Sequence, residues 1–176
     1  MQRMRTGAGF YGLVFAAGFI TFALHEGGHW LAGTLLGHEA HYGLNGAGVR
    51  ANVTWTHGMI IIAAGPAVTI AQGLIALWLV QARASAAAWV FLFWAAFMRF
   101  KATVITLWNP NDEARIGLEL GLGPWPLPVV VTGGLFVLLA IGSRRLKMSW
   151  TTLALSWVVA SVAASAIVGL DMVMSG

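Results

Sequence analysis

The residue types most capable of chemistry in this chain lie together in one apolar run, where His25, Glu26 and His29 occur within five positions. Residues four apart project from the same face of a helix, so the two imidazoles can point at a common atom. Neutral imidazole is a good zinc ligand, and Glu26 lies one position further round, where a carboxylate can take a proton from a bound water. The pattern predicts a metal centre with Glu26 as general base; a structural polar cluster is the alternative.

The rarity of these residues supports the metal interpretation. The chain has five His and four Glu, and an ionisable side chain inside lipid is costly unless it has a function or a specific partner. Gly27 and Gly28, between the two histidines, leave the helix surface bare and permit close approach of another element.

A catalytic zinc site takes three protein ligands and leaves a fourth position open, so a third ligand has to come from elsewhere in the chain. We favour Asp112, in LWNPNDEARIG, because Asn109-Pro110 breaks a helix there and the broken end can turn a carboxylate inward. A solvated turn residue is the alternative interpretation of Asp112. The other candidate ligands are His38, Glu39, His41, His57, Glu113 and Glu119.

The elements that must position these residues are membrane helices. The chain is 59% hydrophobic and 9% charged, with a mean hydropathy of +0.79, whereas soluble domains carry about 25% charged residues. Runs close to the roughly 20 apolar residues of a bilayer span cover 8–36, 58–82, 86–108, 126–142 and 150–171. The first run has the basic start of a secretory signal but continues past signal length.

We therefore predict one all-α polytopic membrane domain over residues 1–176, with about five transmembrane helices. A three-helix core would cover 8–120, and 121–176 would add two helices to which the sequence assigns no role.

A polar segment between the first two spans, GHEAHYGLNGAGVRANVTWTHG, predicts a small β-hairpin. Asn45-Gly46 is a turn signal, and VRANVTW alternates apolar and polar residues. Because open strand edges cannot face lipid, such a hairpin must be covered by helices or lie in a water-filled cavity. A glycine-rich loop without strand pairing is the alternative.

Charge and cysteine usage narrow the functional classes. No cysteine is present, which excludes disulfides, thiolate metal ligands and a cysteine nucleophile. The net charge of +4 reflects basic residues in short loops, which indicates membrane orientation rather than a nucleic-acid partner. Most of them fall on one side of the predicted layout, namely Arg3, Arg5, Arg83, Arg144, Arg145 and Lys147, against Arg50 and Arg115 on the other.

The positive-inside rule then places the N-terminus in the cytoplasm, in a multi-pass protein that we expect in the plasma membrane. The same layout puts His25, His29 and Asp112 at similar depth, on the outer side.

Taken together, these motifs resemble those of the site-2 protease family of intramembrane zinc metalloproteases. In that family an H-E-x-x-H lies within a transmembrane helix, a Gly-Pro element opens the next span, and an Asn/Pro…Asp-Gly motif on a third helix supplies an aspartate ligand. This chain has HEGGH, AAGPAVTI with Gly65-Pro66, and NPNDE in the same order, over about residues 8–120.

The resemblance implies one zinc ion bound by His25, His29 and Asp112, with Glu26 as general base. It implies substrate-binding roles for Asn109, Gly65 and Pro66. The chain departs from the family pattern at Thr69, where many members have Asn, and at Glu113, where glycine is usual, so Glu113 is a competing or assisting ligand.

The function expected from this pattern is hydrolysis of peptide bonds in membrane-spanning protein substrates within the lipid bilayer. The pattern is compatible with a regulatory partner but does not identify one. The alternatives are a zinc-dependent membrane hydrolase of a lipid or amide, and a non-catalytic binding or scaffold protein. Arg99 and Lys101 lie inside the third span, where pairing with Glu113 or Glu119, or snorkelling, is favoured over contact with a substrate carboxylate or a lipid phosphate.

Overall fold

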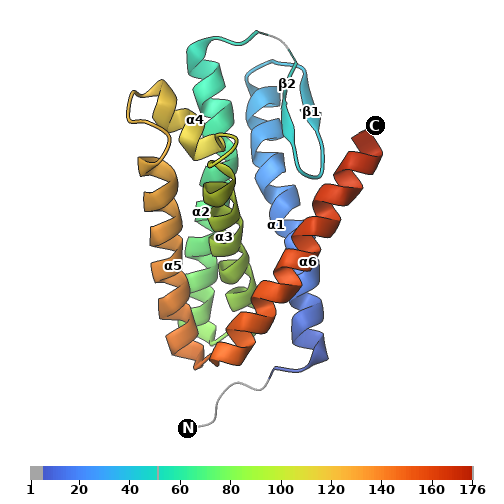
Figure 1. The fold of residues 1–176 in the computed structure, drawn as a ribbon, viewed down its shortest axis with the longest axis vertical. Helices are drawn as coiled ribbons and strands as arrows, with labels where there is room; N and C mark the ends of the chain where they lie inside the picture. The colour runs from blue at the N-terminus through green and yellow to red at the C-terminus, as the bar shows by residue number, and fades with distance from the viewer. Residues whose placement is uncertain (1–5, 51, 176) are drawn as a thin grey trace.

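A computed structural model describes residues 6–50 and 52–175 of the chain. Within this part, five helices are long and apolar enough to cross a membrane, and a sixth is short (Figure 1). The long ones are α1 (Ala8–Leu35), α2 (Trp55–Arg83), α3 (Ala86–Ile105), α5 (Pro126–Leu146) and α6 (Trp150–Ser175), and the short one is α4 (Asp112–Glu119). The predicted class, an all-α multi-pass membrane protein with a small hairpin after its first span, is confirmed.

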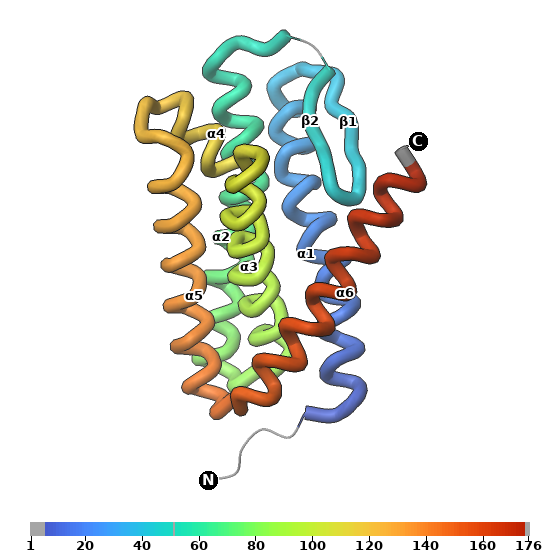
Figure 2. The backbone as a smooth tube through the Cα atoms, in the orientation of Figure 1, coloured from blue at the N-terminus to red at the C-terminus, as the bar shows by residue number. Residues whose placement is uncertain are grey.

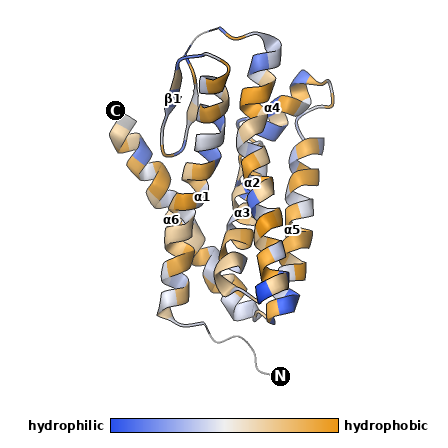
Figure 3. Cartoon of the chain, turned by 180° about the vertical axis from the view of Figure 1, so that it is seen from behind, coloured by the Kyte–Doolittle hydropathy of each residue, from blue (hydrophilic) through white to orange (hydrophobic). Residues whose placement is uncertain are grey.

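α3 is the central helix of the bundle. It packs against α1, α2 and α5, and its side chains Trp89, Phe93 and Trp94 have no exposed surface. Lipid is as apolar as these side chains, so close packing rather than exclusion of water holds such helices together. Gly18 on α1 makes one close approach possible, because a Cβ there would lie 2.8 Å from Cη2 of Trp94. Hydrophobic residues predominate along the long helices (Figure 3), and many large ones, such as Leu74, Trp78 and Val130, are exposed.

The hairpin consists of β1 (Ala40–Tyr42) and β2 (Ala47–Val49), which pair antiparallel. It lies along the end of α1, where the Tyr42 hydroxyl donates to the carbonyl of Ala23 at 3.2 Å. The end of α6, which slants across the bundle toward the hairpin (Figure 2), supplies Asp171, whose Oδ1 accepts from the backbone N–H of Leu44 at 2.8 Å. Helices on two sides therefore hold the hairpin.

The strand predicted over VRANVTW is wrong in its extent. β2 ends at Val49, Ala51 lies outside the described residues, and Trp55 already begins α2. Thr54 stops the extended segment because its side chain accepts a hydrogen bond from the backbone N–H of His57 at 3.3 Å, as a helix N-cap does.

The ends of other spans also differ from the hydropathy prediction. α3 ends at Ile105 rather than at residue 108, and the segment expected as an acidic turn forms α4. Asn111 caps α4, with its Oδ1 accepting from the backbone N–H of Ala114 at 2.9 Å. α5 continues through Arg144 and Arg145 to Leu146, since cations are favourable in the last turn of a helix.

The charge asymmetry on which the orientation prediction depends is present in the described part of the chain. The last turns of α2 and α5, at the end of the bundle opposite the hairpin and α4 (Figure 1), contain Arg83, Arg144 and Arg145, and Lys147 directly follows α5. Arg3 and Arg5 lie outside the described residues. The cytoplasmic position of the N-terminus stays a prediction.

Candidate metal centre

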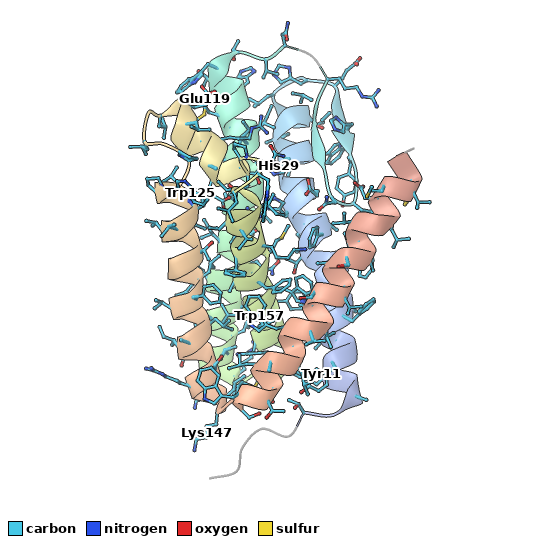
Figure 4. All side chains as sticks on the ribbon, viewed as in Figure 1. Tyr11, His29, Glu119, Trp125, Lys147 and Trp157 are labelled. Carbon is cyan, nitrogen blue, oxygen red and sulfur yellow. The ribbon has the colours of Figure 1, made fainter. Side chains whose placement is uncertain are left out.

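Three side chains from α1 and α4 converge on one point in the upper half of the bundle, where Figure 4 labels His29. The Nε2 atoms of His25 and His29 lie 3.3 Å apart. Oδ2 of Asp112 lies 3.3 Å from Nε2 of His25 and 3.5 Å from Nε2 of His29. Zinc bonded tetrahedrally at about 2.0–2.1 Å places neighbouring ligand atoms about 3.3 Å apart. The three atoms thus have the spacing of three corners of a tetrahedral zinc site.

Hydrogen bonds to α2 hold both imidazoles through Nδ1. Nδ1 of His29 lies 2.7 Å from the carbonyl oxygen of Ile61, which only accepts, so this nitrogen carries the proton. The Thr69 hydroxyl donates to the carbonyl of Gly65 at 3.2 Å, so its oxygen accepts from Nδ1 of His25 at 3.0 Å. Both Nε2 atoms are then left as acceptors that face the carboxylate of Asp112. A proton or a metal cation can lie among them, and the Arg99 guanidinium already lies 3.3 Å from Nε2 of His25.

Gly65 lets α2 lie directly against the imidazoles of His25 and His29. A Cβ at this position would collide with Nε2 of His29 and lie 2.6 Å from Cε1 of His25. Any side chain here would fill the space on which the ligand atoms converge. Gly65 and Pro66, predicted to bind substrate, are both buried within α2, and the contact that the structure gives Gly65 is with the imidazoles.

Glu26, the predicted general base, is buried on α1 beside this group, with 7% of its surface exposed. Its carboxylate lies near the backbone N–H of Ala47 in β2. The carboxylate is therefore not one of the three converging ligand groups but lies next to them, facing the hairpin.

A buried ion pair, Arg99 with Glu113, adjoins the ligand group. Nη1 of Arg99 donates to both carboxylate oxygens of Glu113, at 3.1 and 3.2 Å, and the two side chains are 3% and 5% exposed. Nη2 lies 3.3 Å from Nε2 of His25, and Nη1 lies 3.6 Å from Oδ2 of Asp112. Arg99 therefore pairs with Glu113 as predicted instead of snorkelling, and Lys101 has intermediate exposure.

The charges of this cluster favour a divalent cation. Glu26, Asp112 and Glu113 contribute three negative formal charges and Arg99 one positive charge, which leaves a net charge of minus two. Burial alone would raise the pKa of the Asp112 carboxyl, but the neighbouring imidazoles of His25 and His29 hold the pKa below its usual range. Uncompensated buried charge is costly, and a divalent cation bound by these groups would bring the sum to zero.

The other candidate residues lie apart from the ligand group. Asn109 is exposed in the loop after α3, whereas the neighbouring Asn111 has a buried Nδ2 without a hydrogen-bond partner. His38 and His57 hydrogen-bond to each other at 2.8 Å. Glu119 accepts from the Trp55 indole at 2.9 Å, Glu39 is exposed, and His41 lies in β1.

Several residues around the centre were not found as site residues from the sequence. The Ile61 carbonyl gives no signal in a sequence, because every residue has a backbone carbonyl. Thr69 was visible only as a departure from a family pattern. Asn111 could have been found, because Asn followed by two acidic residues is the signature of a helix N-terminus.

Comparisons with known proteins assign no family to the chain. No family model matches the chain, and neither the curated proteins nor the solved structures contain a match. Any function has to be inferred from the site itself.

Proposed function

We propose that this protein is an intramembrane zinc metalloprotease, a hydrolase that cleaves membrane-spanning protein substrates. The observation that carries the proposal is the convergence of the Nε2 atoms of His25 and His29 and Oδ2 of Asp112, at 3.3 to 3.5 Å from one another, next to Glu26. Two imidazoles and one carboxylate are the donor set of many catalytic zinc sites, and three protein ligands leave a position open for a reactant. The site-2 protease motifs in the sequence support the same reading.

The residues of this chain fit zinc in three respects. The ligand atoms have the spacing of a tetrahedron, and the Nδ1 hydrogen bonds to Ile61 and Thr69 leave both Nε2 atoms as acceptors, with Nη2 of Arg99 3.3 Å from that of His25. The formal charges of the cluster sum to minus two. When bound, zinc supplies a Lewis acid that polarises a carbonyl and lowers the pKa of water from about 15.7 to about 7.

Glu26 has the position of a proton carrier in peptide hydrolysis. It takes a proton from the attacking water, whose oxygen bonds to the scissile carbonyl carbon, and delivers it to the amine nitrogen as the C–N bond breaks. Its place directly after His25 on α1 keeps the carboxylate within reach of the ligand group while leaving the ligand set complete. Proton transfer by a positioned carboxylate contributes roughly 100- to 10,000-fold in rate.

The hairpin supports a peptide substrate over a lipid. The backbone N–H of Ala47 in β2 lies near the Glu26 carboxylate, so a strand of the hairpin lies beside the proposed base. Extended peptides bind to exposed strand edges through backbone hydrogen bonds, and hydrolysis in a membrane requires an unwound peptide bond. A substrate segment that pairs with the hairpin would be extended next to the metal centre.

The proposal includes the plasma membrane as location and a cytoplasmic N-terminus. The cluster of Arg83, Arg144, Arg145 and Lys147 at one end of the bundle supports the cytoplasmic N-terminus, because cytoplasmic loops carry the excess of basic residues.

Glu26→Gln is the substitution that tests the mechanism. We expect the purified variant to bind one zinc per chain but to cleave labelled single-span peptides in liposomes at least 100-fold more slowly than the wild type. Glu39→Gln is the matched control, because Glu39 is exposed and outside the site. Labelled phospholipids are assayed in parallel. Cleavage by Glu26→Gln at the wild-type rate would refute the mechanism, and cleavage of lipid without peptide would replace the proposed substrate class.

A further inference from the structure

A cavity lies far from the candidate metal centre, between α5 and α6. α6 packs along α1 and slants away from α5, to which it is joined by the short turn 147–149 (Figures 1 and 2). The opening has a volume of about 640 Å³, within the range of about 300–1,000 Å³ that ligand sites occupy. It extends from Lys147 at the lower end of the bundle to Trp157, midway along α6 (Figure 4).

The cavity has an apolar wall and a cationic mouth. The wall is formed by apolar side chains of both helices, including Phe136, Leu139, Leu153 and Trp157. The mouth carries Arg144, in the last turn of α5, and Lys147, which follows it with a positive φ of 52°. Trp150, the first residue of α6, also lines the cavity, and tryptophan is enriched at the boundary between hydrocarbon and headgroups.

A hydroxyl donor adds to the mouth. Oγ of Ser143 accepts a hydrogen bond from the indole N–H of the buried Trp89 at 2.8 Å, so the Ser143 hydroxyl hydrogen is left to donate. Two cations and one hydroxyl donor at the mouth of the cavity can bind an anion with several acceptor oxygens.

The cations at the mouth have no acidic group near them. All six acidic residues of the chain belong to the described part, and all lie toward the hairpin and α4. Asp112, Glu113 and Glu119 are in α4, and Glu39 precedes β1. Glu26 lies near Ala47 of the hairpin, and Asp171 accepts a hydrogen bond from the backbone N–H of Leu44. The positive charge of Arg144 and Lys147 is therefore left for an external anion.

We propose that this cavity binds an acidic phospholipid. An acyl chain lies against the apolar wall, and the phosphate lies at Arg144 and Lys147. Basic pockets between transmembrane helices are typical sites for anionic headgroups, whereas a zwitterionic headgroup brings a positive charge of its own toward the two cations. This binding site is independent of the proposed protease activity.

The test measures which lipids stay bound to the protein. The full chain is reconstituted in bilayers of equal phosphatidylglycerol and phosphatidylcholine, extracted with mild detergent, and analysed by native mass spectrometry. We expect phosphatidylglycerol to be retained on the order of tenfold over phosphatidylcholine, since each basic residue near an anionic lipid adds to binding. Arg144→Gln/Lys147→Gln should reduce this preference to less than twofold. Equal retention of both lipids by the wild type would overturn the proposal.

Two further variants separate the cavity from general surface charge. Ala154→Trp fills the cavity without changing charge and should lower retention of both lipids. Arg83→Gln removes a cation from the same end of the bundle but outside the cavity lining, and should leave the lipid preference unchanged. An equal loss of preference in Arg83→Gln and Arg144→Gln/Lys147→Gln would contradict a defined site. Displacement of the lipid by inorganic phosphate alone would contradict binding of the acyl chain. Far-UV circular dichroism checks that each variant is folded.

Discussion

Gly65→Ala is the substitution that acts most directly on the geometry of the metal centre. The added Cβ would collide with Nε2 of His29 and lie 2.6 Å from Cε1 of His25. Carbon atoms in contact lie about 3.5–4.0 Å apart, so the His25 ring has to move by about 1 Å. Metal–ligand distances tolerate about 0.2 Å, and disturbing a group that merely orients a ligand already costs about 10- to 100-fold in affinity. We therefore expect zinc affinity to fall at least 100-fold, or about 2.7 kcal/mol.

The assay is a competition titration with a chromophoric zinc chelator in detergent, together with the zinc content of the purified protein. Gly27→Ala is the matched control, because Gly27 lies between the two histidines on α1 and a Cβ there meets nothing within 4 Å. Alanine is more favourable than glycine inside a helix by about 0.5–1 kcal/mol, so loss of helix is not expected in either variant. Zinc affinity of Gly65→Ala within threefold of the wild type would refute the geometric reasoning.

Three more predictions follow from the surroundings of the centre. Thr69→Val removes the hydroxyl that accepts from His25 and should lower zinc affinity about 10- to 100-fold in the same titration, whereas Thr69→Ser should keep it. Arg99→Met leaves Glu113 buried without its partner and should lower the free energy of unfolding by about 3–5 kcal/mol, measured as a lower Tm. The double variant Arg99→Met/Glu113→Met should recover most of this stability, and an equal loss in both variants would contradict the pairing. Chelation of the metal should lower the Tm and zinc should restore it, because the stripped cluster keeps buried negative charge that protons compensate only in part; an unchanged Tm would contradict the charge argument.

Hydropathy was sufficient to predict the five spans, since lipid requires long apolar helices with internally satisfied backbones. It failed where other forces set the boundaries. α5 extends through Arg144 and Arg145, because charged residues at a span end are favourable although they lower the hydropathy. Hydropathy does not predict α4, because this helix has only eight residues and is polar. A helix of this length depends on its cap at Asn111.

In the hairpin, the position of the turn could be predicted from the sequence, but the register of the two strands could not. Asn45-Gly46 lies in the loop between β1 and β2, as the turn signal predicted. The register depends on tertiary packing: a Cβ on Gly33 of α1 would lie 2.9 Å from Cγ1 of Val49, so the second strand fits against a bare patch of α1. Alternation of side chains over VRANVTW carried no information about that contact.

The candidate metal ligands also differ in whether local sequence or tertiary packing brings them together. His25 and His29 are recognisable from local spacing, because one turn of helix brings them together. Asp112 is 83 residues further along the chain than His29, and only the packed bundle brings its carboxylate within 3.5 Å of both imidazoles. The partners that orient the imidazoles, a hydroxyl and a backbone carbonyl on α2, likewise depend on how α1 and α2 pack.

X-ray absorption at the zinc edge, on the purified protein loaded with one equivalent of zinc, tests the metal centre most directly. The structure predicts two imidazole nitrogens and carboxylate oxygen at about 2.0–2.1 Å, and a spectrum that loses the carboxylate contribution in Asp112→Ala. A spectrum with a single imidazole, or one that Asp112→Ala leaves unchanged, would contradict a shared site for His25, His29 and Asp112.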